Sequence, residues 1–126
     1  MKKWLYVIAC FIFIAGCASA PKMTAIKDMP VGAPVEHIQI TGDKCEWSPA
    51  VIKVKQGTHV FLEVHSVDWD YNFQLKKYGL HFPVKKGETV TAEFYASEKG
   101  DFEYGCYIEK GFHYEWGGMI GKLIVE

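Results

Sequence analysis

The chain predicts an all-β domain, and three observations lead to this fold class. Apolar and polar residues alternate in several short segments, as they do in strands with one buried face. Glycine-marked turns separate these segments at intervals of about 8–12 residues, which is typical of antiparallel sandwiches and barrels. No window shows the period of an amphipathic helix. We therefore expect an antiparallel β-sandwich or barrel.

Each expected strand rests on its local pattern. The first two alternate and are followed by turns at Thr41-Gly42-Asp43 and Gln56-Gly57. The third is more continuously apolar, and the last closes the chain. In order, the expected strands occupy residues 37–40, 51–54, 60–64, 73–75, the surroundings of Val84, 89–95, 102–106 and 123–125.

The N-terminus has the order of features of an export signal. Lys2 and Lys3 precede an uncharged apolar run over residues 4–14, which is short for a bilayer span. The ending Ile14-Ala15-Gly16-Cys17 resembles the lipobox of bacterial lipoproteins, which are cleaved before the cysteine and lipidated on it. The resemblance implies a signal peptide at 1–16 and a lipid on Cys17; an uncleaved membrane anchor is the alternative. Either arrangement places the domain outside the cytoplasm, and Ala18 favours the outer membrane in a Gram-negative cell.

A flexible, lipidated tether is expected over residues 17–34, because this segment is small, polar and marked by prolines. The folded domain then occupies residues 35–126, about the size of one small domain. Removal of Lys2 and Lys3 leaves 12 lysines against 15 carboxylates, a net charge of about −3, and the chain has no arginine. This composition argues against nucleic acid as a partner.

Three side chains with metal-binding chemistry follow one another in the loop before the last strand. They are Cys106, His113 and Met119. Soft sulfur ligands stabilise Cu(I) and imidazole suits both copper valences, so the set predicts a copper site. The alternatives are a buried cysteine, a packing histidine and a core methionine. No catalytic triad order, phosphate loop or HExxH motif is present, so we expect a copper-binding protein or electron carrier rather than a hydrolytic enzyme.

Four segments resemble the cupredoxin family of copper proteins. They are residues 45–57, with Trp47-Ser-Pro49 before an alternating strand, residues 67–73, residues 84–90, and the Cys106 loop with its closing strand. The resemblance spans most of residues 35–126. It implies a Greek-key, cupredoxin-like sandwich.

Within that family the loop is most similar to that of cytochrome oxidase subunit II. Cys106 matches the first cysteine of that motif, but Lys110 stands at the second and cannot bridge two copper ions. The resemblance therefore implies a mononuclear site. A weaker similarity is to the red-copper nitrosocyanins, which have a carboxylate at the first histidine position and an open coordination position.

Tyr71 stands where the family carries its first histidine ligand. It is either a phenolate ligand or a core aromatic whose hydroxyl is satisfied by hydrogen bonds. His81, expected on the loop after residues 73–75, could replace the missing histidine. Glu109 could turn back to the same metal, although a solvated loop charge is the simpler interpretation.

Cys45 has two possible roles. It lies two residues before Trp47, so both side chains are expected on one inward face of a strand near the metal. Cys45 is then either a second thiolate ligand or the disulfide partner of Cys106.

Three functions remain open from the sequence. The first is a membrane-tethered cupredoxin that transfers single electrons to or from a redox protein. The second is a lipoprotein that senses Cu(I) or delivers it to a copper-accepting protein. The third is a metal-free module in which Cys45 and Cys106 form a disulfide.

Overall fold

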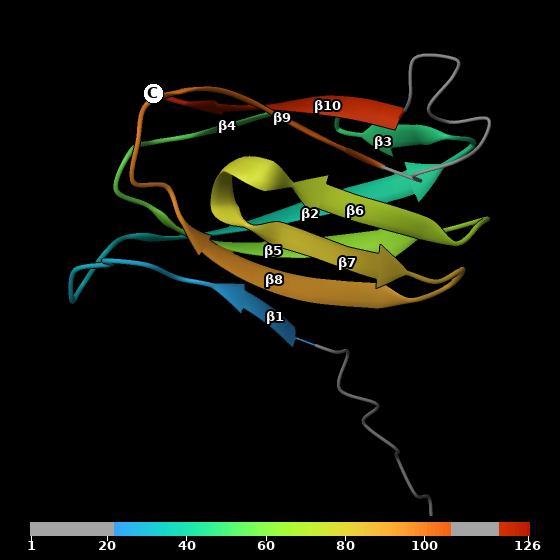
Figure 1. The fold of residues 1–126 in the computed structure, drawn as a ribbon, viewed down its shortest axis with the longest axis horizontal. Coiled ribbons are helices and arrows are strands. Elements are labelled where there is room, and N and C mark those ends of the chain that lie inside the picture. Colours follow the sequence, from blue (N-terminus) through green and yellow to red (C-terminus); the bar gives the residue numbers. More distant parts are fainter. Residues whose placement is uncertain (1–21, 107–118) are drawn as a thin grey trace, which may run out of the picture.

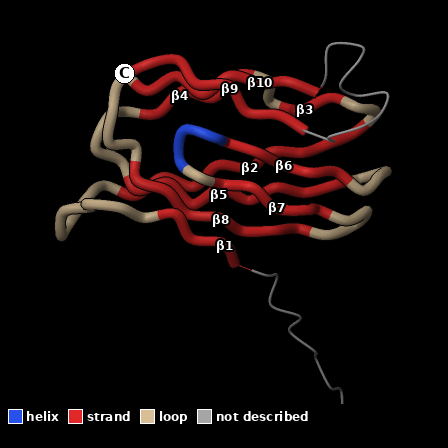
Figure 2. Tube along the Cα trace, viewed as in Figure 1, coloured by secondary structure: helices blue, strands red, loops and turns tan. Residues whose placement is uncertain are grey.

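The computed structural model describes residues 22–106 and 119–126, which form ten strands and one short 3-10 helix. These are, in chain order, β1 (Lys22–Ala25), β2 (Val35–Asp43), β3 (Glu46–Ser48), β4 (Val51–Val54), β5 (His59–Ser66), β6 (Tyr71–Leu75), η1 (Lys76–Tyr78), β7 (Leu80–Val84), β8 (Thr89–Tyr95), β9 (Gly100–Cys106) and β10 (Met119–Val125). Figure 2 shows the helical turn as the connection between β6 and β7. No helix among the described residues combines the length and the apolar character needed to cross a membrane.

The strands form two sheets that face each other, as Figure 1 shows. One has the order β1-β8-β5-β2-β3, and the other has the order β4-β10-β9-β6-β7. The expected all-β sandwich is confirmed. Both sheets are mixed, because β1 with β8, β2 with β5, and β4 with β10 pair in parallel, whereas the other described pairs are antiparallel.

Alternation along each strand builds the core between the sheets. In β5 every second residue, from Val60 through Leu62 and Val64 to Ser66, is buried, while the residues between them are partly exposed. The inner face of β6 adds Tyr71, Phe73 and Leu75 from the opposite sheet. Complete burial of each aliphatic or aromatic side chain contributes roughly 1.5–3 kcal/mol relative to leaving it in water.

One strand that holds the edge of a sheet was absent from the sequence-based expectation. Lys22–Ala25 lies in the segment expected to be a flexible tether, yet it forms β1 and pairs with β8. An edge strand of this kind is held by backbone hydrogen bonds, which leave no signature in hydrophobic periodicity. The strand expected around Val84 is β7, which begins at Leu80 and pairs with β6, so His81 lies in a strand and not in the expected loop.

The first expected turn is also displaced. Residues 41–43 belong to β2, and the chain reverses at Lys44 and Cys45, between the paired residues Asp43 and Glu46. Gly42 is required inside the strand, because a Cβ there would lie 2.9 Å from both the Trp47 and Tyr71 rings. The glycine therefore marks a close approach of two aromatic rings and not a turn.

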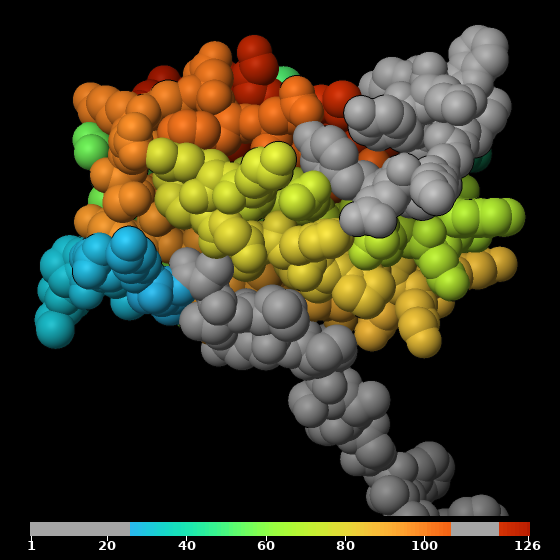
Figure 3. Space-filling view, viewed as in Figure 1, coloured from blue at the N-terminus to red at the C-terminus, as the bar shows by residue number. Residues whose placement is uncertain are grey.

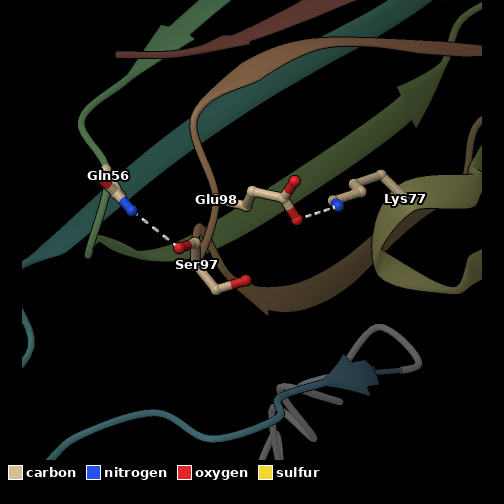
Figure 4. Close-up of polar contacts among 4 residues, drawn as sticks. All are labelled: Gln56, Lys77, Ser97 and Glu98. Atoms are coloured by element: carbon tan, nitrogen blue, oxygen red, sulfur yellow. Dashed lines mark hydrogen bonds and ion pairs between the residues drawn. The ribbon is translucent and has the colours of Figure 1, made fainter.

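The two ends of the sandwich differ in what they carry. At one end, on the right in Figure 1, lie the β2–β3 turn, the β5–β6 and β7–β8 connections, the end of β9 and the start of β10. At the other end polar contacts join neighbouring connections, as Figure 4 shows. There Gln56 donates a hydrogen bond to the Ser97 carbonyl, and Lys77 pairs with Glu98.

Substitution of Gly121 tests the packing of β9 against β10. Gly121 lies opposite Tyr104, and a Cβ at this position would overlap the Tyr104 ring. That ring is fully buried, and its hydroxyl donates to the Pro49 carbonyl at 2.7 Å, so it has little freedom to move. Gly121→Ala should lower the free energy of unfolding by about 1–3 kcal/mol, measured by urea denaturation.

The matched control for Gly121→Ala is Ile120→Thr. Ile120 is 48% exposed on the outer face and both residue types favour strands, so its effect should stay within about 0.5 kcal/mol. Equal stability of Gly121→Ala and the unmodified chain would show that Tyr104 can move away.

Candidate metal centre

Cys106 provides a buried thiol at the last position of β9. Its side chain is 5% exposed, and its Sγ accepts a hydrogen bond from the Asn72 backbone N–H of β6 at 3.2 Å. Burial raises the pKa of the Cys106 thiol, and the Asn72 N–H acts in the opposite direction. A buried thiol with a fixed N–H donor becomes a thiolate most readily when a cation replaces its proton.

Met119 lies beside Cys106 on the neighbouring strand. The two residues are directly opposite each other in the β9–β10 register, and both are buried, so their sulfur-bearing side chains share the inner face. The Met119 carbonyl accepts a hydrogen bond from Trp47 Nε1 at 3.0 Å, which ties the start of β10 to β3. The thiol and the thioether therefore lie together at one end of the core.

Tyr71 is the first residue of β6 and is 2% exposed. Its hydroxyl donates to Asp68 Oδ1 at 2.6 Å and accepts from the Cys45 backbone N–H at 3.2 Å. Burial, assisted by the Asp68 hydrogen bond, raises the pKa of Tyr71 to about 12. In this geometry the phenol is protonated at neutral pH and both of its hydrogen-bonding functions are used, as the core-aromatic interpretation of the sequence expects.

Cys45 is not on an inward strand face, which corrects the position expected from its spacing to Trp47. It lies in the β2–β3 turn and is exposed, whereas Trp47, inside β3, is 4% exposed. The expected alternation fails because β3 begins only at Glu46 and Cys45 is needed to reverse the chain. Neither Cys45 nor Cys106 is part of a disulfide in the described structure.

His81 is not brought together with Cys106. His81 is exposed and lies on the edge strand β7, where it pairs with Gln74 of β6. Its neighbours Leu80 and Phe82 are buried and point into the core. The imidazole therefore lies on the outer face of the sheet, opposite to the face that holds Cys106. The expected substitution of His81 for the missing histidine finds no support in this arrangement.

The other candidates from the sequence, Glu109, His113 and Cys17, lie outside the described residues. Within residues 22–106 and 119–126, no three His, Cys, Asp or Glu side chains are grouped as a metal site. Among the described residues, Cys106 and Met119 are two candidate ligands that the strand register brings together.

Sequence reasoning did not identify three contributors to this end of the fold. The Asn72 N–H, the Asp68 carboxylate and the Trp47 indole act through hydrogen bonds to Cys106 Sγ, the Tyr71 hydroxyl and the Met119 carbonyl, respectively. The Asn72 N–H and the Trp47 indole lie 34 and 72 residues from their partners along the chain, so no local pattern marks them. Asp68 lies only three residues from Tyr71 and was not singled out.

Several solved structures have the same fold. The metal-binding domain of the Streptococcus pneumoniae D39 Cu(I)-exporting P-type ATPase CopA, solved with Cu(I), matches with a TM-score of 0.63 and 17% identity over 85% of this chain and 97% of that chain. Auracyanin A, a blue copper protein from Chloroflexus aurantiacus, matches with a TM-score of 0.58 and 17% identity over 73% and 99%. The periplasmic domain of cytochrome oxidase subunit II from Bradyrhizobium japonicum matches with a TM-score of 0.60 and 17% identity over 71% and 83%.

These similarities confirm the cupredoxin-like fold expected from the sequence. At such low identity they establish the fold alone. No protein-family model matches the chain, and no curated protein sequence matches it.

Tyr71→Phe tests whether the hydroxyl of Tyr71 contributes to this end of the fold. The substitution leaves the Cys45 N–H without its acceptor and the Asp68 carboxylate without one donor. We expect the free energy of unfolding to fall by about 1–3 kcal/mol in chemical denaturation.

Tyr95→Phe is the matched control, because the Tyr95 hydroxyl makes no hydrogen bond to another described residue. It should change stability by less than about 0.5 kcal/mol. Equal losses in both variants would contradict a specific role of the Tyr71 hydroxyl.

Proposed function

We propose that this chain is an extracytoplasmic, lipid-anchored copper protein with a cupredoxin-like domain, whose mononuclear site transfers single electrons. Cys106 and Met119 would hold the copper ion, with His113 as the imidazole ligand suggested by the sequence. The observation that carries the proposal is the buried Cys106 Sγ, which has a fixed N–H donor and a thioether residue opposite it.

The donor chemistry fits copper. Thiolate and thioether sulfur are soft ligands that favour Cu(I), and an imidazole is compatible with both valences. Bound copper would supply the one-electron redox chemistry. The hydrogen bond from Asn72 would orient the Cys106 Sγ and withdraw charge from it, which is one way in which residues beyond the ligands tune a metal.

The surroundings favour electron transfer because they are rigid and dry. The Trp47 ring contacts the Tyr71 and Phe73 rings, with ring centres 5.7 and 5.5 Å apart. Phe73 in turn contacts Tyr104, and these four aromatic residues are buried in the same core as Cys106 and Met119. A scaffold of this kind limits ligand movement between the two valences and excludes water.

A redox partner could approach at the same end of the domain. Figure 3 shows the β5–β6 and β7–β8 connections projecting there. The β5–β6 connection exposes Val67 by 46% and Trp69 by 64%. Exposed aromatic and aliphatic side chains of this kind are suited to protein contacts.

Delivery or sensing of Cu(I) is the second candidate function. It is supported by Tyr71, whose protonated hydroxyl is engaged by Asp68 and the Cys45 N–H and therefore offers no phenolate ligand to Cu(II). The fold is also shared with a metal-binding domain that was solved with Cu(I), although that resemblance concerns the fold alone.

Visible absorption and electron paramagnetic resonance of the copper-loaded chain test the function. The full chain in mild detergent, loaded with Cu(II), should show an intense thiolate-to-copper band and about one copper per chain. Cys106→Ser should abolish the band, because the proposed thiolate is removed. His81→Ala is the control and should leave the band unchanged, since His81 lies on the outer face.

The outcomes of this experiment separate the functions. A band that is lost on reduction and restored on oxidation, with copper retained, supports electron transfer. Absence of colour together with tight Cu(I) binding supports delivery or sensing. Absence of copper binding, with a disulfide between Cys45 and Cys106, would contradict both copper functions.

A further inference from the structure

The β2–β3 turn has an unusual backbone for its sequence. Lys44 and Cys45 are its two central residues, and their φ angles are 51° and 60°. Two-residue hairpin loops with both φ angles positive normally use Asn-Gly or Asp-Gly, because a side chain at such angles is strained. Neither position in this turn is a glycine, so the turn presents a thiol at a conformational cost.

Two side chains hold this turn in place, Asp68 from the β5–β6 connection and Tyr71 from the start of β6. Asp68 Oδ2 accepts a hydrogen bond from the Lys44 N–H at 2.9 Å, and the Tyr71 hydroxyl accepts one from the Cys45 N–H at 3.2 Å. Tyr71 also donates to Asp68 Oδ1 at 2.6 Å, which links the two acceptors. Both amides of the strained turn are therefore bound by a connected Asp68–Tyr71 pair.

The next residue of β6 contacts Cys106. Asn72 follows Tyr71, and its N–H donates to Cys106 Sγ at 3.2 Å. Two consecutive residues of β6 thus contact the two cysteines, one through the Cys45 amide and the other through the Cys106 sulfur. The β2–β3 turn, which carries Cys45, lies at the same end of the sandwich as the end of β9, which carries Cys106 (Figure 1).

We infer that Cys45 is a second thiolate ligand beside Cys106 and that Asp68 and Tyr71 are positioning residues for it. This inference rests on the proposed copper site and defines its preferred ion. Two thiolates with the Met119 thioether form a soft, electron-rich set that favours a monovalent cation, Cu(I), over Cu(II). Each thiol releases its proton to solvent as its sulfur binds the ion, so binding through both cysteines releases two protons.

Cys45→Gly separates the ligand role from a purely structural role. Glycine accepts a positive φ without strain, so the variant should raise Tm by a few degrees. It also removes the thiolate, so Cu(I) affinity should fall by more than about 100-fold, beyond the range of outer-shell substitutions. Affinity is measured on the full chain in mild detergent by competition with a coloured Cu(I) chelator, with the N-terminal segment the same in every variant.

A rise in Tm with Cu(I) affinity unchanged within about twofold would overturn the inference, because Cys45 would then only occupy the turn. Cys106→Ser in the same assay tests the underlying copper site. If Cys106→Ser leaves Cu(I) affinity unchanged, the proposed function itself fails. Loss of affinity in Cys106→Ser but not in Cys45→Gly leaves the copper site standing and rejects the second thiolate.

Asp68→Ala tests the positioning role through a double-mutant cycle. Removal of the carboxylate releases the Lys44 N–H and the Tyr71 hydroxyl, and Cu(I) affinity should fall by about 10-fold. In the Cys45→Gly background the same substitution should have no further effect on affinity, because the positioned thiol is absent. An equal loss in both backgrounds would show that Asp68 acts on the general fold and would reject its positioning role.

Discussion

The hydrogen bond from the Asn72 N–H to Cys106 Sγ is the contact on which this end of the molecule depends. It joins β6 to the end of β9 and fixes the sulfur within the buried face of the sheet. Because β9 pairs with β10, the same register places Met119 beside Cys106, and Trp47 secures Met119 through its carbonyl. The end of β9 and the start of β10 therefore present two sulfur residues opposite each other, which are soft donors of the kind that Cu(I) prefers.

Tyr71 illustrates how one substitution changes the chemistry of a shared fold. At the position where the cupredoxin resemblance expects an imidazole, the chain has a phenol that is buried, protonated and hydrogen-bonded on both sides. The hydroxyl supports the β2–β3 turn instead of a metal, and the turn carries Cys45. In the copper site proposed above, loss of one nitrogen donor and gain of the Cys45 thiol would both move the preference towards Cu(I).

Hydrophobic alternation predicted the strands that face the core. The expected bounds of β4 and β8 agree with the structure, because each has one buried and one outward face. Backbone-driven features were not predictable in this way: β1 is an edge strand, and Gly42 is required by packing and not by a turn. The sequence grouped Cys106 and Met119 with His113 as one set of candidate ligands, and the register places the first two opposite each other. Hydrogen bonds across 26 and 34 residues, to Cys45 and Cys106, leave no local pattern.

X-ray absorption at the copper edge of the Cu(I)-loaded chain is the most direct test of the account. It identifies the atoms bound to the metal without requiring colour or activity. The account predicts a first shell dominated by sulfur, which loses sulfur in Cys106→Ser. A shell of only nitrogen and oxygen atoms, or one that is unchanged in Cys106→Ser, would contradict copper ligation by Cys106.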